Sequence, residues 1–156
     1  MARAAAILRD LRCPFVINQN RYSILDRGAE RSGILRATKE AKRGLIVFSP
    51  LAQGLLSDRY LHGIPADSRA RTDGRFLNES RLTPEVLAKV KALHAIAAER
   101  GQTLSQMALS WLYAKEEVTS VLIGASRPEQ ILENLKMTDN ARFTAEELAA
   151  IDAAVL

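Results

Sequence analysis

Polar side chains that could bind an anion follow an apolar run near the C-terminal end of the sequence. Residues 120–123 read as a buried strand, and Gly124, Ala125 and Ser126 lead from it toward a helix beginning near Arg127. Free N–H groups and the positive end of the dipole favour phosphate at such a helix start, and an arginine adds a planar cation. The pattern predicts a phosphate site, with a plain helix cap and a surface charge as the alternative reading.

Candidate ligand-binding residues also follow the other two apolar runs. Phe48 closes the run 45–48 and precedes Ser49, so an aromatic ring, a hydroxyl and backbone amides come together at one strand end. The ring could stack on a flat ligand, and the alternative is a core phenylalanine followed by a turn. Gln19 follows the run 15–18, and a buried amide there needs a hydrogen-bond partner from the protein or from a ligand.

Metal chemistry and the common nucleophilic sites find no support. His62 and His94 have no cysteine or acidic partner at ligand spacing, so no metal site is predicted. No Ser-His-Asp or Cys-His arrangement can be placed, and no pair of carboxylates is isolated enough to act as an acid and base. We therefore nominate no catalytic residue.

The three apolar runs are too short for helices and are typical of buried parallel strands. Residues 28–43 show helical spacing with Gly44 as a stop, which predicts a strand–helix–strand unit. Residues 49–80 form a loop of about thirty residues, a length that is usually functional. In α/β proteins, ligands bind at the C-terminal ends of parallel strands. The polar residues after the run 45–48 and after the run 120–123 both lie at such ends.

Helix starts are marked by capping residues. Thr83 with Pro84 predicts a helix that ends near Gly101. Capping boxes at 103–106, 126–129 and 144–147 predict three more helices, the second ending near Met137, and the opening segment reads as an amphipathic helix. Met107 and Trp111, at helical spacing, are predicted to pack in the core.

The composition fits one soluble domain. The chain has 156 residues, 47% hydrophobic and 26% charged, and such a length can bury a core without disulfides. Cys13 is the single cysteine, which fits a reducing compartment. The net charge of +4 is not gathered in a basic stripe, so nucleic-acid binding is not expected. No apolar run could cross a bilayer and nothing resembles a signal peptide, so a cytoplasmic location is the default expectation.

Five segments together resemble one family. They are VINQNRYSILDR (16–27), FSPLAQGLLSDRY (48–60), GIPADSRA (63–70), ALSWLY (108–113) and VLIGASRPEQILEN (121–134). The chain resembles the C-terminal part of an aldo-keto reductase, particularly the bacterial branch similar to glyceraldehyde 3-phosphate reductases and potassium-channel beta subunits. The resemblance implies an α/β fold, a partial (β/α)8 TIM barrel over residues 1–156 that starts at the fifth helix and contains strands six to eight.

The resemblance also implies NADPH as cofactor. Gln19 would hold the nicotinamide amide and Phe48 would stack on its ring. Arg59 stands where a lysine often folds over the cofactor, and Arg69 where another basic loop residue approaches it. The remaining implied contacts are Ser49, Pro50, Leu51 and Ala52 at the pyrophosphate, Ser126, Arg127, Gln130, Glu133 and Asn134 at the 2′-phosphate and adenine, and Gly124 beside them.

The family's catalytic tyrosine, lysine, aspartate and histidine match no residue of this chain. Tyr22, Tyr60 and Tyr113 lie in other sequence contexts. We therefore expect the NADPH-binding portion of a reductase of small aldehydes or ketones, inactive alone, with a carbonyl substrate in the complete enzyme. The alternative is a truncated, non-catalytic module that binds nucleotide or associates through its open sheet edge, with itself or with an N-terminal half. Neither a membrane nor a nucleic acid is expected as a partner.

Overall fold

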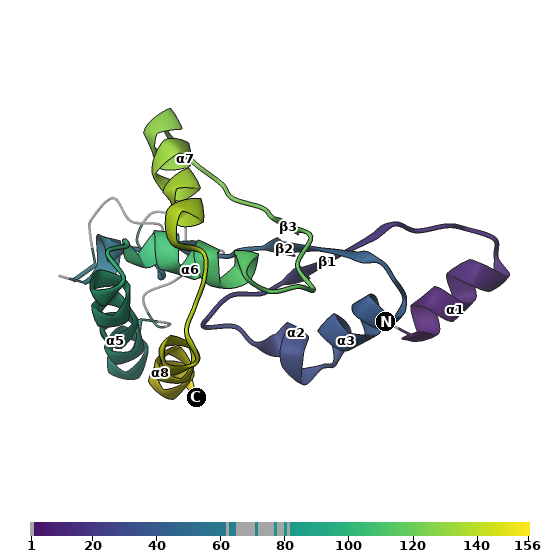
Figure 1. Ribbon diagram of the computed structural model, residues 1–156, viewed down its shortest axis with the longest axis horizontal. Coiled ribbons are helices and arrows are strands. Elements are labelled where there is room, and N and C mark those ends of the chain that lie inside the picture. Colours follow the sequence, from purple (N-terminus) through teal and green to yellow (C-terminus); the bar gives the residue numbers. More distant parts are fainter. Residues whose placement is uncertain (1, 62, 65–70, 72–76, 78–79, 81) are drawn as a thin grey trace.

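A three-stranded parallel sheet positions the rest of the chain (Figure 1). The computed structural model describes residues 1–156 except 1, 62, 65–70, 72–76, 78–79 and 81. The strands are β1 (Ile17–Arg21), β2 (Gly44–Phe48) and β3 (Ser120–Val121), in the order β1-β2-β3. Ile17 pairs with Gly44, and Ile46 with Ser120. The parallel pairing predicted from the sequence is confirmed.

The strands are less buried than their composition predicts. Leu45 and Val47 are fully buried, whereas Phe48 and Ile17 are 37% and 41% exposed. The register places Ile17, Gln19, Ile46 and Phe48 on one face of the sheet. Within the described residues, helices cover only the opposite face, so the expectation of strands buried on both faces is wrong. The third strand is also shorter than predicted, although Leu122 N still donates to Val47 O.

Two helices, not one, connect β1 to β2. They are α2 (Gly28–Arg31) and α3 (Ile34–Glu40), and Gly33 interrupts them at φ 71°. This left-handed conformation favours glycine because it has no Cβ. Gly44 does not stop the helix; it opens β2, where an added Cβ would lie 3.1 Å from atoms of Ile17 and Thr119.

Most of the predicted helix boundaries are confirmed. The first helix is α1 (Ala2–Asp10), and Thr83 caps α5 (Pro84–Glu99). Both sides of the capping box are present at the starts of α6 (Leu104–Tyr113) and α8 (Ala145–Val155). Short 3₁₀ turns lie at η1 (Ala52–Gly54), η2 (Asp58–Tyr60) and η4 (Lys136–Asn140). The exception is α7 (Pro128–Leu135), which has no side-chain cap and ends before Met137.

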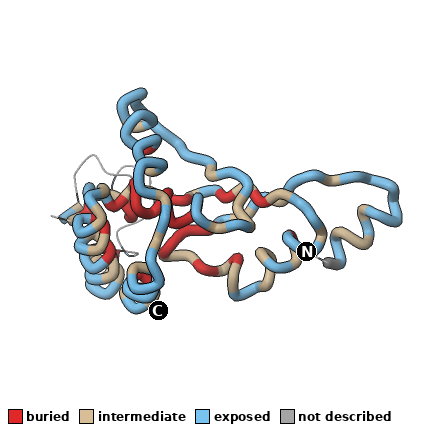
Figure 2. The backbone as a smooth tube through the Cα atoms, viewed as in Figure 1, coloured by how far each residue is buried: buried red, intermediate tan, exposed pale blue. Residues whose placement is uncertain are grey.

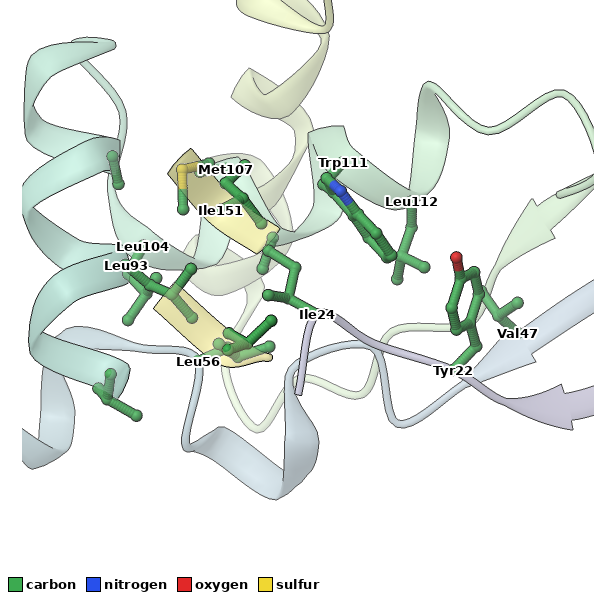
Figure 3. Packing of buried hydrophobic residues seen from close by; sticks show 14 of the residues in the cluster. Tyr22, Ile24, Val47, Leu56, Leu93, Leu104, Met107, Trp111, Leu112 and Ile151 are labelled. Carbon is green, nitrogen blue, oxygen red and sulfur yellow. The ribbon is translucent and has the colours of Figure 1, made fainter. Parts of the chain in front are cut away.

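The core lies between the covered face of the sheet and helices α5, α6 and α8 (Figures 2 and 3). Helix α6 is its centre, and Met107 and Trp111 are buried as predicted. Other side chains of this core, labelled in Figure 3, are Tyr22, Ile24, Val47, Leu56, Leu93, Leu104, Leu112 and Ile151. Helix α6 precedes β3, and Ser105 at its start donates to Leu56 O in the loop after β2 at 3.1 Å, so its packing helps to place both segments.

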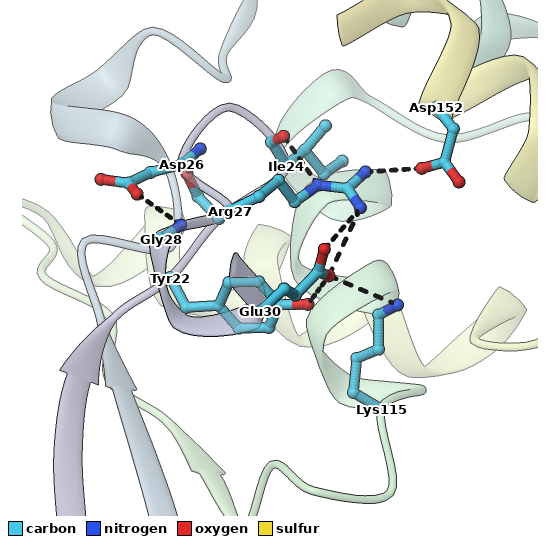
Figure 4. A network of polar contacts seen from close by, with 9 residues as sticks. Tyr22, Ile24, Asp26, Arg27, Gly28, Glu30, Lys115 and Asp152 are labelled. Carbon is cyan, nitrogen blue, oxygen red and sulfur yellow. Dashed lines mark hydrogen bonds and ion pairs between the residues drawn. The ribbon is translucent and has the colours of Figure 1, made fainter. Parts of the chain in front are cut away.

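A partly buried polar network joins the segment after β1 to α6 and α8 (Figure 4). Arg27 donates to Ile24 O at 3.1 Å and pairs with Asp152 at 2.8 Å and Glu30 at 3.4 Å. Glu30 also accepts from the Tyr22 hydroxyl and lies 3.9 Å from Lys115 Nζ. Burial and the hydrogen bond to Glu30 raise the pKa of Tyr22 well above its ordinary value.

Candidate functional site

A groove of about 930 Å³ opens beside the C-terminal ends of β2 and β3. Its walls are the loop after β2, the start of α6 and the segment that leads from β3 into α7. The sequence-predicted residues that it brings together are Ser49, Pro50, Leu51, Arg59, Gly124, Ser126, Arg127, Gln130, Glu133 and Asn134. Residues far apart in sequence thus form one cavity at the strand ends.

Four of the predicted residues lie elsewhere or cannot be placed. Gln19 and Phe48 are exposed on the open face of the sheet and do not line this groove, nor does Ala52, which packs against the core. Arg69 lies outside the described residues. The exposure of Phe48 excludes a core phenylalanine at this position, and Gln19 needs no buried partner because it is solvent-exposed.

The loop after β2 adopts an unusual backbone conformation. Ser49, Ala52 and Gln53 have φ values of 53°, 48° and 62°, which L-residues adopt at an energetic cost. Ala52 N donates to Ser49 O at 3.0 Å, and Gln53 Nε2 donates to Ser49 Oγ at 2.8 Å. These bonds turn the chain tightly around Ser49 and bring Pro50 and Leu51 to the groove.

The predicted capping box at 126–129 is wrong. Ser126 N and Oγ both donate to Gln130 Oε1, at 2.8 and 3.2 Å, and Glu129 takes no part. The reason is that Arg127 is extended (φ −143°, ψ 145°) and occupies the N-cap position, so Ser126 lies outside the helix. The phosphate hypothesis survives this correction, because Arg127 still stands at the helix start.

The side chain of Arg127 is exposed and has no ion pair or hydrogen bond within the part of the chain that the structure describes. Acidic groups also line the groove, namely Asp58, Glu129 and Glu133. Lys136 pairs with Glu133 at 2.7 Å and offsets one of them. Arg59 and Arg127 are cations that line the same groove, so its walls carry charges of both signs.

Asn134 is a buried amide that lines the groove. It is 9% exposed, and its side chain makes no hydrogen bond to the residues described. Buried amides are normally hydrogen-bonded, so an unpartnered one at a cavity wall suits a polar ligand. The groove therefore places a neutral amide, Asn134, and a cation, Arg127, along one cavity.

Several groove residues were not predicted from the sequence. They are Gln53, Ser57, Asp58, Tyr60, Thr103, Ser105, Leu122, Ile123 and Glu129. Thr103 and Ser105 belong to a capping box that the sequence revealed, but nothing in the pattern indicated that the start of α6 would face the end of β3. Only the packing of α6 brings these segments together.

The described residues contain neither a cluster of metal ligands nor a helix that could span a membrane. No three His, Cys, Asp or Glu side chains come together there as metal ligands would. Within the same residues, no helix has the length and apolar character that crossing a membrane requires.

Comparison with known proteins identifies the family. The model of the aldo/keto reductase family matches residues 1–156. L-Glyceraldehyde 3-phosphate reductase of Escherichia coli K12 is 46% identical over 149 residues, which are 94% of this chain and 43% of the relative. A probable voltage-gated potassium channel subunit beta of rice is 37% identical over 126 residues, covering 80% of this chain and 38% of the relative. The chain therefore spans less than half the length of these relatives.

Solved structures agree with this assignment. The thermostable aldo-keto reductase Tm1743 matches with TM-score 0.63 and 29% identity over 90% of this chain and 40% of its own. An aldo-keto reductase of Bacillus halodurans in its holo form matches with TM-score 0.68 and 25% identity over 97% and 47%. These neighbours are TIM barrels, and the three parallel strands correspond to part of such a barrel. The chain belongs to the aldo/keto reductase family.

Proposed function

We propose that this chain, as one partial domain over residues 1–156, is the NADPH-binding portion of a reductase that acts on small aldehydes or ketones. The observation that carries the proposal is the groove that contains both the Arg127 guanidinium and the buried Asn134 amide, neither of which has a side-chain partner among the residues that the structure describes. A cation and a neutral amide along one cavity suit a phosphorylated nucleotide better than an apolar ligand.

The groove residues divide into groups that suit different parts of NADPH. Ser126, Arg127 and Gln130 stand at the α7 N-terminus and suit a 2′-phosphate, while Glu133 and Asn134 suit the adenine. Ser49, Pro50 and Leu51 suit the pyrophosphate, with Arg59 beside them. Phe48 and Gln19, exposed on the sheet face, suit the nicotinamide. When bound, NADPH supplies a hydride to a carbonyl carbon, and these residues hold and orient it.

The tyrosines of this chain do not supply the proton that reduction of a carbonyl requires. The Tyr22 hydroxyl donates to Glu30 inside the core, and its pKa is raised by burial. Tyr60 lines the groove but is only 2% exposed, and Tyr113 is exposed at the far end of α6. We therefore propose that turnover requires residues beyond those of this chain.

Exposed apolar side chains and unpaired strand edges favour a second role for this protein, association with another chain. Exposed apolar side chains lie just beyond β3, at Leu122 and Ile123, and along α7, and the outer edges of β1 and β3 carry no partner strand among the residues described. Unpaired edges and apolar surface favour pairing with another chain. The rice and Arabidopsis relatives are named as channel subunits, so we propose association, with itself or a complementary half, as the competing function. A cytoplasmic location remains part of the proposal.

The test is a calorimetric titration of the chain with NADPH and with NADH. We expect NADPH to bind, and we expect Asn134→Ala to weaken both cofactors by about ten-fold, since one hydrogen bond contributes about 1 kcal/mol or somewhat more. Arg36→Ala is the matched control because Arg36 is exposed on α3 away from the groove. Absence of NADPH binding by the unaltered chain would refute the cofactor role and leave association as the function.

A further inference from the structure

Gln106 uses both ends of its side-chain amide within the core. Its Oε1 accepts from Thr103 N at 3.0 Å, which completes the capping box of α6. Its Nε2 donates to Glu133 O on α7 at 3.0 Å and lies 3.5 Å from Glu133 Oε2. Gln106 is buried, whereas its partners Thr103 and Glu133 are exposed, so both contacts are partly shielded from water. One side chain thus ties the start of α6 to the last turn of α7.

Helix α7 buries little apolar surface against the rest of the protein. Asn134 is its single buried residue, while Ile131, Leu132 and Leu135 are exposed. In Figure 2 most of α7 has the colour of exposed residues. Figure 1 shows α7 rising from α6, away from the helices that cover the sheet. With so little apolar burial, its position depends on polar contacts at its C-terminal end.

The hydrogen bond from Gln106 satisfies a backbone carbonyl group at the C-terminal end of α7. Glu133 O belongs to the last turn, where carbonyl groups have no partner within the helix. A second contact follows in η4, where Ser110 Oγ donates to Met137 O at 2.7 Å. The two α6 side chains thus hold α7 and its continuation at neighbouring points.

We infer that Gln106 is a positioning residue that holds α7 so that Glu133 and Asn134 face the groove. The inference rests on the proposed NADPH site, because Glu133 and Asn134 are its proposed adenine contacts. Gln106 does not line the groove itself and acts through α7. Its loss is expected to weaken ligands that carry adenine and to leave α6 helical.

One substitution separates this role from helix capping. Glutamate at the third position of a capping box accepts the same hydrogen bond as glutamine, so Gln106→Glu retains the cap on α6. The carboxylate cannot donate to Glu133 O, and it lies against the carboxylate of Glu133. Gln106→Met, of similar length, removes the donor without adding a charge. Thr144→Ala is the control, since Thr144 makes its capping hydrogen bonds with Glu147 at the start of another helix, α8.

The experiment uses adenosine 2′,5′-bisphosphate as the probe, titrated into the chain and its variants. We expect both Gln106 variants to bind it about ten-fold more weakly and Thr144→Ala to bind it as the unaltered chain does. Reduced nicotinamide mononucleotide, which lacks adenine, should bind equally to all of them. Hydrogen exchange in the absence of any ligand should be faster in residues 129–137 of Gln106→Glu and unchanged there in Thr144→Ala.

The outcomes distinguish the two proposals. If the unaltered chain binds the bisphosphate and Gln106→Glu binds it equally well, the positioning role is overturned and the cofactor site stands. If the unaltered chain does not bind the probe, the cofactor site falls, and the exchange measurement alone decides whether Gln106 holds α7. Unchanged exchange in α7 overturns the inference in either case.

Discussion

The guanidinium of Arg27 lies 4.3 Å from the centroid of the Trp111 ring while it pairs with Asp152 at 2.8 Å. Lys115 Nζ is a second cation near the same ring, at 4.4 Å. Arg27 precedes α2, Trp111 lies on α6 and Asp152 on α8, so a single side chain links three segments distant in sequence. Cation–π contacts of partly desolvated groups contribute about 0.5 to 2 kcal/mol each.

Arg27→Ala is expected to lower the free energy of unfolding by about 2 to 3 kcal/mol. The change removes a mostly buried cation and leaves Glu30 and Asp152 without it. Chemical denaturation followed by Trp111 fluorescence measures the loss. Arg36→Ala removes an exposed pair with Glu40 and should change stability by less than about 0.5 kcal/mol. Equal effects of the two substitutions would show that the network contributes no stability.

Stability should fall above about pH 10 through Tyr22. Burial, followed by the bond to Glu30, raises the pKa of this phenol in the folded state, while the unfolded chain titrates near 10. The native state then holds a proton that the unfolded state has released, so stability is fully present below pH 10 and is lost as pH rises. The decline approaches about 1.4 kcal/mol per pH unit. Tyr22→Phe should show a shallower decline between pH 9 and 11; parallel curves would contradict the assignment.

Arg127→Ala is expected to weaken NADPH by about ten-fold or more and to leave NADH almost unchanged. The guanidinium is exposed at the α7 N-terminus, and a charge-assisted bond to the 2′-phosphate contributes about 1.5 to 3 kcal/mol. Titrations with the two cofactors at one ionic strength provide the comparison. Equal losses for both would remove Arg127 from the 2′-phosphate contact.

The chain is expected to self-associate at micromolar concentration or to require a complementary half. Leu122 and Ile123 beyond β3, and Leu132 on α7, are 42%, 38% and 64% exposed, and apolar surface beside an unpaired strand edge favours association. Sedimentation velocity across a range of concentrations tests this. Leu132→Gln should shift the distribution toward the monomer. A stable monomer of the unaltered chain at every concentration would refute the expectation.

No reduction of methylglyoxal or glyceraldehyde 3-phosphate is expected from this chain and NADPH alone. General acid catalysis supplies about 10²- to 10⁴-fold in rate, and we expect none of the tyrosines to provide it, including Tyr60, which lines the groove but is buried. NADPH oxidation is followed for the chain alone and after mixing with the N-terminal half of a full-length relative. Turnover by the chain alone that Tyr60→Phe abolishes would assign the acid role to Tyr60 in the groove.

The sequence predicted the parts of the fold that depend on local signals. The boxes at Thr103 and Thr144 and the proline after Thr83 are complete within a few residues, and all three mark true helix starts. The box at Ser126 has the same pattern and is wrong, because the extended conformation of Arg127 moves the helix start. A pattern of side chains cannot report a backbone conformation that neighbouring segments impose.

The candidate site was predicted in outline and not in its shape. The strand-end rule and the family resemblance together indicated residues near Ser49 and Arg127, and these line one groove. The contribution of Thr103 and Ser105 follows from how α6 packs, which no spacing encodes. The exposure of Phe48 could not be predicted either. An apolar run has the same sequence pattern whether helices cover one face of its sheet or both faces.

The backbone conformation of residues 49–53 limits which amino-acid substitutions this loop tolerates. Ser49, Ala52 and Gln53 hold left-handed conformations that glycine adopts without strain. Ala52→Gly would therefore relieve the folded backbone at the same time as it enlarges the number of conformations open to the unfolded chain, two effects of opposite sign. Larger β-branched residues at these positions face the full steric penalty. This part of the loop is thus a segment in which the backbone angle, as well as side-chain contacts, limits the substitutions that the fold accepts.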